Sequence, residues 1–454
     1  MGAVIARCVA AATAASTGIL VLLAVGCQSR RGELREFDVT AAPASIPLID
    51  GRTMRVWAYN GQVPGPTLRI RLGDTLRVRF TNHLPQSTTV HWHGVRVPNA
   101  MDGVPWVTQP PIEPGETFVY EFAPKDAGTF WFHPHIRSSE QVERGLFGVL
   151  IVEDLEQPLS RDELWVLDDM LLAPDGQIAP AFNTRHDLAH DGRWGNVLVV
   201  NGRRGAELAV QPGERLRLRL VNVANGRVFR PDFSPLEAKI IAVDGLYAAR
   251  PVDPMGFELA PGNRVELDIV VPQDLAGRRV LIADRFTRRE LPLAAIVVGA
   301  GPPLATTRIA PTMREQLRSW GFPGEEPVRA EFLLNARAGG PFGIEWTING
   351  EAMDHAGHSS NATSYALPLG KPSRIRFINQ SFRLHPMHLH GMSFQVISRN
   401  DVPVDEPFSR DTVLVHPKES IEVGVVPVDP GTWMAHCHVL EHAEAGMMTL
   451  VEVR

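Results

Sequence analysis

The sequence predicts an all-β protein made of three consecutive β-sandwich or barrel domains. Short segments with alternating apolar and polar residues dominate the chain, as in 117–122, and such alternation is typical of strands with one buried face. The 39 Gly and 37 Pro among 454 residues suit many short strands joined by turns. Helical periodicity is scarce, and 311–320 is the best candidate for a short helix.

One sequence pattern occurs three times and predicts the domain organisation. Each copy runs from a Gly through an alternating strand to an Asn nine residues later, and an Asn-Gly pair precedes it. The copies, about 140 to 160 residues apart, are spaced by the size of a domain. We therefore predict domains at 35–155, 160–300 and 325–454, with the Gly/Pro-rich stretch 299–303 as the second linker. The copies are 73–82, 213–222 and 370–379.

The charge pattern bears on partners. The net charge is -6 and no long run of Lys or Arg occurs, so no nucleic-acid partner is expected. Arginine pairs alternate along several strands, and this spacing favours solvated outer faces of sheets. The pairs are Arg69 with Arg71, Arg77 with Arg79, and Arg217 with Arg219.

Residues 1–27 are predicted to be a targeting leader. Arg7 precedes an apolar stretch that ends in small residues and Cys27, similar to a bacterial lipoprotein cleavage box, although Ala24 stands where Leu is usual. We expect a periplasmic protein, anchored to the membrane only through a lipid on Cys27; plain cleavage or an uncleaved anchor is the alternative. The other cysteines are Cys8 and Cys437, so the mature chain cannot form an intramolecular disulfide, and Cys437 needs another role, such as metal ligation.

Ten of the 16 histidines fall in four short clusters that keep register with the repeat. His91 lies nine residues after Asn82, and His388 lies nine residues after Asn379. In the second domain the equivalent position is Pro231 and no His-x-His pair occurs, so this domain is expected to be a spacer without a metal site. The clusters are His91-Trp92-His93, His133-Pro134-His135, His385 with His388 and His390, and His436-Cys437-His438 with His442.

Strand geometry predicts two adjoining metal sites. Residues i and i+2 point to one face of a strand, so four His-x-His pairs direct eight imidazoles to one site. Cys437 faces the other way from its two neighbours and, with His385, His442 and Met447, makes the ligand set of a blue-copper site. A single His-x-His pair could equally bind zinc or arise by chance, but zinc does not need eight imidazoles beside a separate His2Cys set.

These motifs resemble the multicopper oxidase family, which includes the laccases, over nearly the whole mature chain. The resemblance implies three cupredoxin-like Greek-key domains and four coppers: one type 1, one type 2 and two type 3. It also implies an enzyme that oxidises a reductant in one-electron steps and reduces dioxygen to water. The implied ligands are His91 and His388 for type 2; His93, His133, His135, His390, His436 and His438 for type 3; and Cys437, His385, His442 and Met447 for type 1.

Two acids are candidates for moving protons. Asp102 follows His93 by nine residues, where similar family members have an acid near the cluster; the alternative is a simple Asp-Gly turn. Several relatives have an acid directly after the last type 1 His, but here that residue is Ala443, whereas Glu441 precedes His442. The catalytic prediction is therefore Asp102 with Glu441, and the second half of the relay stays open.

The reductant is the least determined feature. Outer-sphere electron transfer requires only that the reductant can approach His442 or His385. A broad substrate range is therefore the default, which favours phenols and aromatic amines. Oxidation of Cu(I), Fe(II) or Mn(II) is the alternative, although the chain has only 12 Met and no Met-rich run, and Cu(I) prefers sulfur. A non-enzymatic copper-binding or scaffold protein is less favoured because all twelve ligands are present. We expect a monomer. His186 and His190 have the i, i+4 spacing of a possible metal site, but they are more simply interpreted as surface residues.

Overall fold

The computed structural model describes residues 32–153, 161–304, 326–353 and 364–454. The predicted leader and the predicted helix at 311–320 lie outside these residues. Strands account for 50% of the residues and helices for 7%, so the all-β prediction is confirmed. In the described part of the chain, no helix combines the length and apolarity that crossing a membrane requires.

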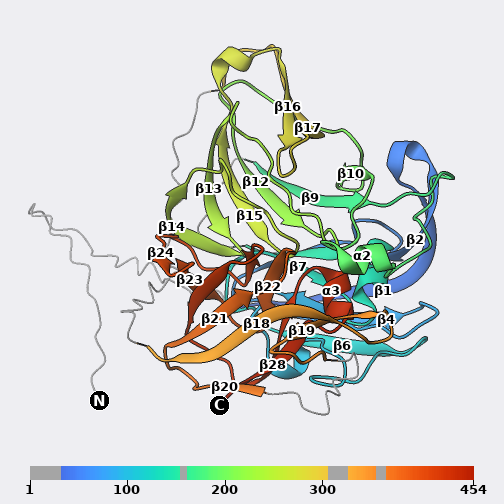
Figure 1. Ribbon diagram of the computed structural model, residues 1–454. Helices are drawn as coiled ribbons and strands as arrows, with labels where there is room; N and C mark the ends of the chain where they lie inside the picture. Colours follow the sequence, from blue (N-terminus) through green and yellow to red (C-terminus); the bar gives the residue numbers. More distant parts are fainter. Residues whose placement is uncertain (1–31, 154–160, 305–325, 354–363) are drawn as a thin grey trace, which may run out of the picture. The chain divides into compact units, whose positions relative to one another are not determined.

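The first third of the fold contains two four-stranded sheets, with strand orders β2-β1-β4-β6 and β3-β8-β7-β5. It appears in blue and cyan in Figure 1. The second sheet carries histidines on neighbouring strands, β5 and β7. The elements are β1 (Leu34–Pro47), β2 (Thr53–Tyr59), β3 (Thr67–Arg71), β4 (Thr75–Asn82), β5 (His91–His93), β6 (Thr117–Phe122), β7 (Gly128–His133), α1 (Ser138–Glu143) and β8 (Gly148–Glu153).

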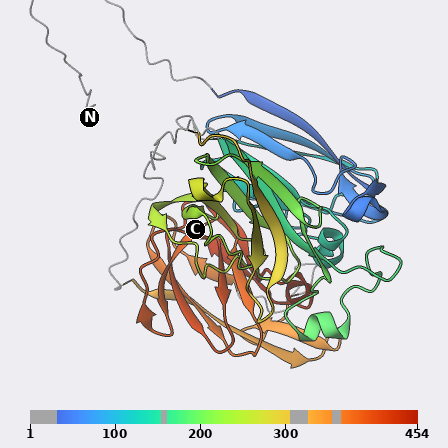
Figure 2. The same cartoon turned by 90° about the horizontal axis from the view of Figure 1, so that it is seen from above.

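The middle third contains a six-stranded sheet, β10-β9-β12-β15-β13-β14, and a three-stranded sheet, β11-β17-β16. Figure 2 shows these strands in green and yellow. The elements are β9 (Asp162–Met170), α2 (Arg185–Ala189), β10 (Val197–Val200), β11 (Ala206–Val210), β12 (Arg215–Asn222), β13 (Glu237–Val243), β14 (Leu246–Val252), β15 (Arg264–Val270), β16 (Arg279–Asp284) and β17 (Leu291–Val298).

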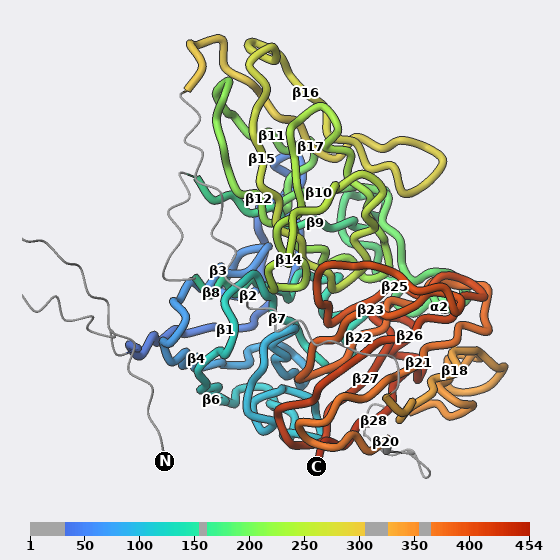
Figure 3. The backbone as a smooth tube through the Cα atoms, turned by 90° about the vertical axis from the view of Figure 1, so that its left-hand side faces the viewer, coloured from blue at the N-terminus to red at the C-terminus, as the bar shows by residue number. Residues whose placement is uncertain are grey.

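The last third contains the sheets β19-β18-β21-β26-β23-β24 and β20-β28-β27-β22-β25. It is drawn in orange and red beside the blue and cyan strands in Figure 3. The elements are β18 (Val328–Ala338), β19 (Ile344–Ile348), β20 (Ser364–Leu367), β21 (Ser373–Asn379), β22 (His385–Leu389), β23 (Phe394–Arg399), β24 (Val402–Pro403), β25 (Thr412–Val415), β26 (Ser420–Val425), β27 (Gly431–Cys437), α3 (Leu440–Glu444) and β28 (Met448–Val453).

The threefold repeat has a structural explanation in its Asn residues. Asn82, Asn222 and Asn379 end strands β4, β12 and β21, and all are buried. Each side-chain NH₂ donates to backbone carbonyls of following loops, as from Asn82 to the carbonyl of Ile112 at 2.8 Å, and each Oδ1 accepts an amide two residues on. Because this side chain satisfies buried backbone groups at the end of a central strand, the same residue recurs in all three copies.

The sheets also bear on the predicted domains. Among the described residues each sheet takes its strands from one third of the chain only. Separate clusters of buried apolar residues accompany the thirds, centred on residues such as Phe80, Leu218 and Phe377. The domain limits themselves stay a prediction.

The predicted solvent exposure of one arginine pair is wrong. Arg217 and Arg219 on β12 are only 5% and 3% exposed. The Arg219 guanidinium donates to Glu266 Oε1 at 2.6 Å and to Thr129 Oγ1 at 2.7 Å, and Thr129 belongs to β7 of the first third. Alternation along β12 identified a polar face correctly, but strands of the first third cover that face, and ion pairing compensates the burial of its charges.

Candidate metal centre

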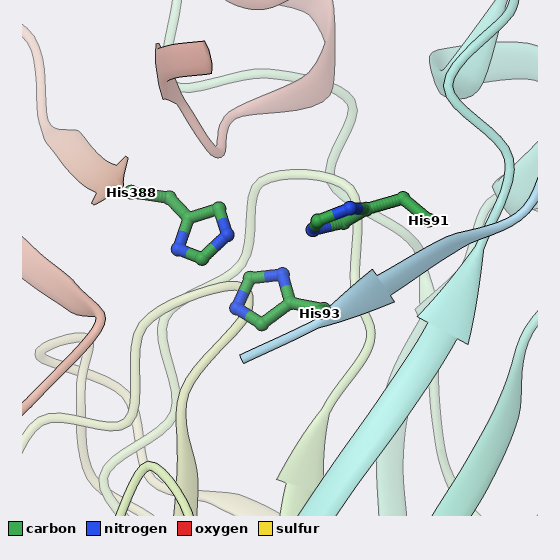
Figure 4. Close-up of side chains that lie close together, drawn as sticks. All are labelled: His91, His93 and His388. Carbon is green, nitrogen blue, oxygen red and sulfur yellow. The ribbon is translucent and has the colours of Figure 1, made fainter. Parts of the chain in front are cut away.

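The eight predicted cluster histidines come together from the first and last thirds of the chain. In the first third, β5 pairs antiparallel with β7 and places His91 opposite His133; in the last, β22 pairs with β27 and places His388 opposite His436. The two pairs of strands therefore present imidazoles in the same way. All eight side chains are buried, with at most 7% exposed. Figure 4 shows His91 and His93 on β5 converging with His388.

The histidines sort into groups whose ligand nitrogens lie within 4.8 Å of one another. One group is His93, His133 and His438. Others join His390 to His91 and His135, and to His388 and His436. Each pair converges on the common cluster, as expected. His91 and His93 share a group with His388, and His388 and His390 share a group with His436, whereas His133 and His135 enter different groups. The groups combine predicted type 2 and type 3 ligands, so the allocation among the coppers stays a prediction.

The hydrogen bonds of the rings show which nitrogens are available for metal. Nδ1 of His91 donates to the Asp102 carbonyl at 2.8 Å, and Nδ1 of His388 donates to the Asp411 carbonyl at 2.9 Å. The opposite nitrogens, Nε2 of His91, His133, His135 and His388, are buried without a hydrogen-bond partner. A buried polar atom without a partner is costly. The residues therefore fit copper, which these nitrogens would bind.

His93 is turned the other way. Its Nε2 lies 3.2 Å from Asp411 Oδ1, and its Nδ1 is the buried nitrogen without a partner. We infer that His93 would bind through Nδ1, whereas its neighbours would use Nε2. This difference between ring nitrogens could not be read from the spacing of the motif.

Burial keeps the imidazoles neutral. It lowers the pKa of His133 and His438 well below the usual value, and the surrounding histidines lower each pKa further. The same causes act on His93, His135, His390 and His436. Neutral imidazole is the form that binds metal, so the cluster is prepared for ligation without first losing protons.

The Cys437 site adjoins the cluster on the opposite side of β27. Its Sγ lies 3.5 Å from His385 Nδ1 and 3.8 Å from His442 Nδ1, and the two nitrogens are 3.3 Å apart. Burial raises the pKa of the Cys437 thiol and lowers the pKa of His442 to about 3. A buried thiol of this kind becomes a thiolate through metal binding, so the three donors suit a copper ion.

Both histidines of this site are oriented through Nε2. His385 Nε2 donates to Ser381 Oγ at 2.8 Å, and His442 Nε2 donates to the His190 carbonyl at 2.7 Å. Both side chains are 0% exposed. The expectation of an approachable histidine is therefore wrong: loops cover both rings, and a reductant would meet the surface above them.

The two adjacent methionines near the end of the chain pack in different apolar clusters. Met447 packs in the apolar cluster that contains Cys437, and its backbone carbonyl accepts the Cys437 amide at 3.0 Å. Met448 lies instead in a cluster with Val104 and Met434. This placement favours Met447 over Met448 as the axial thioether.

Replacing Met447 with Leu is expected to raise the reduction potential of the type 1 copper, because a thioether stabilises Cu(II) slightly and Leu offers no ligand. Spectroelectrochemical titration of the blue absorption would measure the change. Met448→Leu is the matched control and should leave the potential unchanged. A higher reduction potential in the Met448→Leu variant alone would identify Met448, and not Met447, as the axial ligand.

The predicted proton-transfer acids have different environments. Asp102 is 0% exposed, and its Oδ2 accepts from His390 Nδ1 at 2.9 Å while Oδ1 lies 3.3 Å from His91 Nδ1. The carboxylate therefore bonds one cluster histidine and lies beside a second, whose Nδ1 donates to the Asp102 backbone carbonyl; a turn residue need do neither. Glu441 is also buried, but its Oε1 accepts from Asn225 at 2.8 Å. Burial raises the pKa of Glu441 to about 7, and its relay role stays a prediction.

A buried ion pair beside the histidines, which the sequence motifs do not predict, has its arginine in the middle third of the chain. Arg264 on β15, 0% exposed, donates to both carboxylate oxygens of Asp411 at 2.9 and 2.7 Å, and Asp411 in turn contacts His93 and His388. Burial favours a raised pKa for Asp411, but Arg264 and His388 outweigh it and hold that pKa below its usual value.

A neighbouring glycine brings the same segment against the histidines. Gly262 has a φ of +88°, and a Cβ there would lie 2.9 Å from both His438 and His93. The middle third is therefore more than a spacer. Among the described residues, however, none of the histidines in the metal-binding groups comes from it. No spacing rule marks Arg264 or Asp411, because their partners lie far away in the sequence.

Buried histidine groups beside a His2Cys set define a copper protein whose two kinds of site share one strand. Three sequence-family models, each described as multicopper oxidase, match residues 41–157, 174–282 and 326–454. This chain belongs to the multicopper oxidase family, and it is an oxidoreductase that binds copper and uses dioxygen.

Solved and curated relatives agree. A multi-copper oxidase from Pseudomonas thermotolerans is 33% identical, with a TM-score of 0.77, over 93% of this chain and 100% of that one. Multicopper oxidase MmcO of Mycobacterium tuberculosis is 29% identical over 91% of this chain and 86% of its own length. A multicopper oxidase from Campylobacter jejuni, described as a metallo-oxidase, is 25% identical, with a TM-score of 0.77, over 94% and 93%. Other relatives are named laccase and iron transport multicopper oxidase.

Proposed function

We propose that the twelve predicted ligands hold four coppers in the arrangement that the family resemblance implies. The buried ring nitrogens without a hydrogen-bond partner carry this proposal, because they belong to histidines whose ligand atoms lie within 4.8 Å of one another in groups of three. Bound copper supplies one-electron transfer from a reductant and the four-electron reduction of dioxygen to water.

Residues of the chain would carry electrons between the two kinds of site, move protons and orient the metal-binding histidines. Cys437 is bonded through the backbone to His436 and His438, so the two kinds of site share covalent neighbours. Asp102 orients His390 and is placed to hold or pass a proton beside His91. The Arg264–Asp411 pair orients His93 and His388, as partners of metal-binding histidines commonly do.

We propose phenols and aromatic amines as the principal reductants. All six methionines in 325–454 are buried, at most 6% exposed, so this region presents no exposed thioether to Cu(I). Relatives named laccase are consistent with the proposal; other relatives are named metallo-oxidase and iron transport multicopper oxidase. The proposed setting is the bacterial periplasm, with a lipid on Cys27 and a monomeric chain.

Oxygen consumption by the copper-loaded enzyme tests the substrate class. We expect kcat/KM for 2,6-dimethoxyphenol to match or exceed that for Cu(I) and Fe(II), measured at one pH without added copper. A metal ion that is better by more than about tenfold, which is about 1.4 kcal/mol of barrier, would replace the phenolic proposal with the metal-ion alternative. Copper-loaded protein that consumes no oxygen with any reductant would contradict the oxidase function.

A further inference from the structure

One hairpin tip of the middle third lies between the two thirds that carry the cluster histidines. Asp244 and Gly245 join β13 to β14, with φ of +48° and +86°, and positive φ at both positions is typical of the tight turn that Asp-Gly favours. On one side, a Cβ added to Gly128 of β7 would overlap the Gly245 carbonyl. On the other side, the Asp244 carboxylate accepts backbone amides of Asp411 and Thr412 from the last third.

The Asp244 carboxylate, 3% exposed, gathers donors from both sides of this interface. Its Oδ2 accepts the amides of Asp411 at 3.1 Å and Thr412 at 3.2 Å, and its Oδ1 accepts the Arg264 amide at 3.0 Å. Asn263 Nδ2 lies 3.1 Å from each of these oxygens. A carboxylate suits this position because it only accepts, whereas a side-chain amide would place N–H groups against these donors.

The peptide group between Asp411 and Thr412 connects this carboxylate to a predicted copper ligand. Its N–H, from Thr412, donates to Asp244, and its C=O, from Asp411, accepts from His388 Nδ1 at 2.9 Å. The N–H and C=O of one peptide group belong to a single conjugated unit. A negative charge that accepts this N–H therefore makes the carbonyl a stronger acceptor, because linked hydrogen bonds polarise one another. The opposite ring nitrogen, Nε2 of His388, is the one without a partner.

The ring of His93 depends on the same two residues. Its Nε2 lies 3.2 Å from Asp411 Oδ1 and 3.3 Å from Thr412 Oγ1, and the Thr412 hydroxyl donates to Asp411 Oδ1 at 2.8 Å. His93 comes from the first third and His388 from the last. A shift of Asp411 and Thr412 would therefore displace one cluster histidine from each of the two thirds.

The Cys437 site is held by other contacts. His385 Nε2 donates to Ser381 Oγ, and His442 Nε2 donates to the His190 carbonyl. The β13–β14 hairpin supplies neither of these partners. The two kinds of site can therefore respond differently to a change in the hairpin.

We propose that Asp244 is a positioning residue of the histidine cluster, which fixes His388 and strengthens its donation to copper through the peptide group between Asp411 and Thr412. The carboxylate acts as the outer partner of a metal-binding histidine, with one peptide group in between. The inference rests on the proposed four-copper function and deepens it, because it gives the middle third a part in binding the cluster coppers and none in the Cys437 site.

Asp244→Asn tests this role in the full chain loaded with copper. Asn has the size of Asp and tolerates positive φ, but it has one acceptor oxygen in place of two. We expect the cluster to bind copper about tenfold more weakly in titrations with EDTA, at the lower end of the usual effect of losing an outer partner. The type 2 electron paramagnetic resonance signal should change, while the blue absorption should match that of the wild type.

Asp284→Asn is the matched control. Asp284 is 0% exposed, lies in the middle third and accepts two backbone amides, from Arg230 at 2.7 Å and from Phe286 at 3.2 Å. Both donors belong to the middle third. This variant can lose stability in the same way, but its type 2 signal and its cluster copper should stay unchanged.

Thr412→Val is the second variant if Asp244→Asn folds poorly. It keeps the amide that donates to Asp244 and removes the hydroxyl that lies 3.1 Å from His388 Nδ1. The type 2 signal should change here as well, again without loss of the blue absorption.

A type 2 signal and copper binding like those of the wild type in Asp244→Asn would overturn the positioning role, as would an unchanged type 2 signal in Thr412→Val. Equal changes in Asp244→Asn and Asp284→Asn would also overturn it, because they would show a general loss of packing. Copper-loaded wild type that is blue but has no type 2 signal would instead overturn the four-copper arrangement, and this inference with it.

Discussion

Replacing Cys437 with Ser is expected to abolish the blue colour of the copper-loaded protein and to reduce its oxidase activity below detection. The colour requires a thiolate bonded to Cu(II), and Cys437 is the one free cysteine in the part of the chain that the structure describes. Its Sγ forms a triangle with the Nδ1 atoms of His385 and His442, at 3.5 and 3.8 Å. A serine hydroxyl stays protonated in so buried a site and is a poor ligand for this copper.

Visible absorption, metal analysis and oxygen consumption measure this result. The variant should retain about three coppers per chain rather than four, because His436 and His438 face the cluster and not Sγ. The Met448→Leu variant, changed outside the Cys437 cluster, should remain blue and active. A blue Ser variant would refute the assignment of Cys437.

Replacing Asp102 with Asn is expected to slow the reaction of the reduced enzyme with dioxygen by about 10- to 100-fold, the usual effect of losing a partner of a metal ligand. Asn preserves the size of the side chain and one hydrogen-bond acceptor for His390, but it can neither take up nor release a proton beside His91. Reduction of the type 1 copper should change much less, since Asp102 contacts the cluster histidines His91 and His390 and not the residues of the Cys437 site.

Stopped-flow measurements separate the two steps: anaerobic bleaching of the blue absorption by a reductant, and reoxidation of the reduced enzyme by dioxygen. Glu441→Gln is the matched acid-to-amide variant. Because Glu441 bonds Asn225 instead of a cluster histidine, we expect it to affect reoxidation less than Asp102→Asn does. If Asp102→Asn slows both steps equally, or neither, Asp102 is a structural turn residue. If Glu441→Gln slows reoxidation more than Asp102→Asn does, Glu441 is the proton-transfer acid.

The repeat and the histidine motifs were sufficient to predict the all-β fold and the gathering of the histidines. Both depend on local periodicity. The alternation of side chains on a strand places His436 and His438 on one face and Cys437 on the other, and the structure shows that separation. The repeated Asn residues likewise mark equivalent strand ends because each satisfies the same backbone groups.

Tertiary structure alone decided what covers each face. Arg217 and Arg219 have the spacing of a solvated face, yet both are buried, and Arg219 bonds Thr129 of the first third. From the sequence, His442 is expected to be approachable, but its side chain is buried and its Nε2 donates to the carbonyl of His190, 252 residues away. The brace between Arg264 and Asp411 spans 147 residues. Periodicity identifies the face of a strand on which a residue lies, whereas the partner on that face depends on the packing of distant segments, which local spacing does not encode.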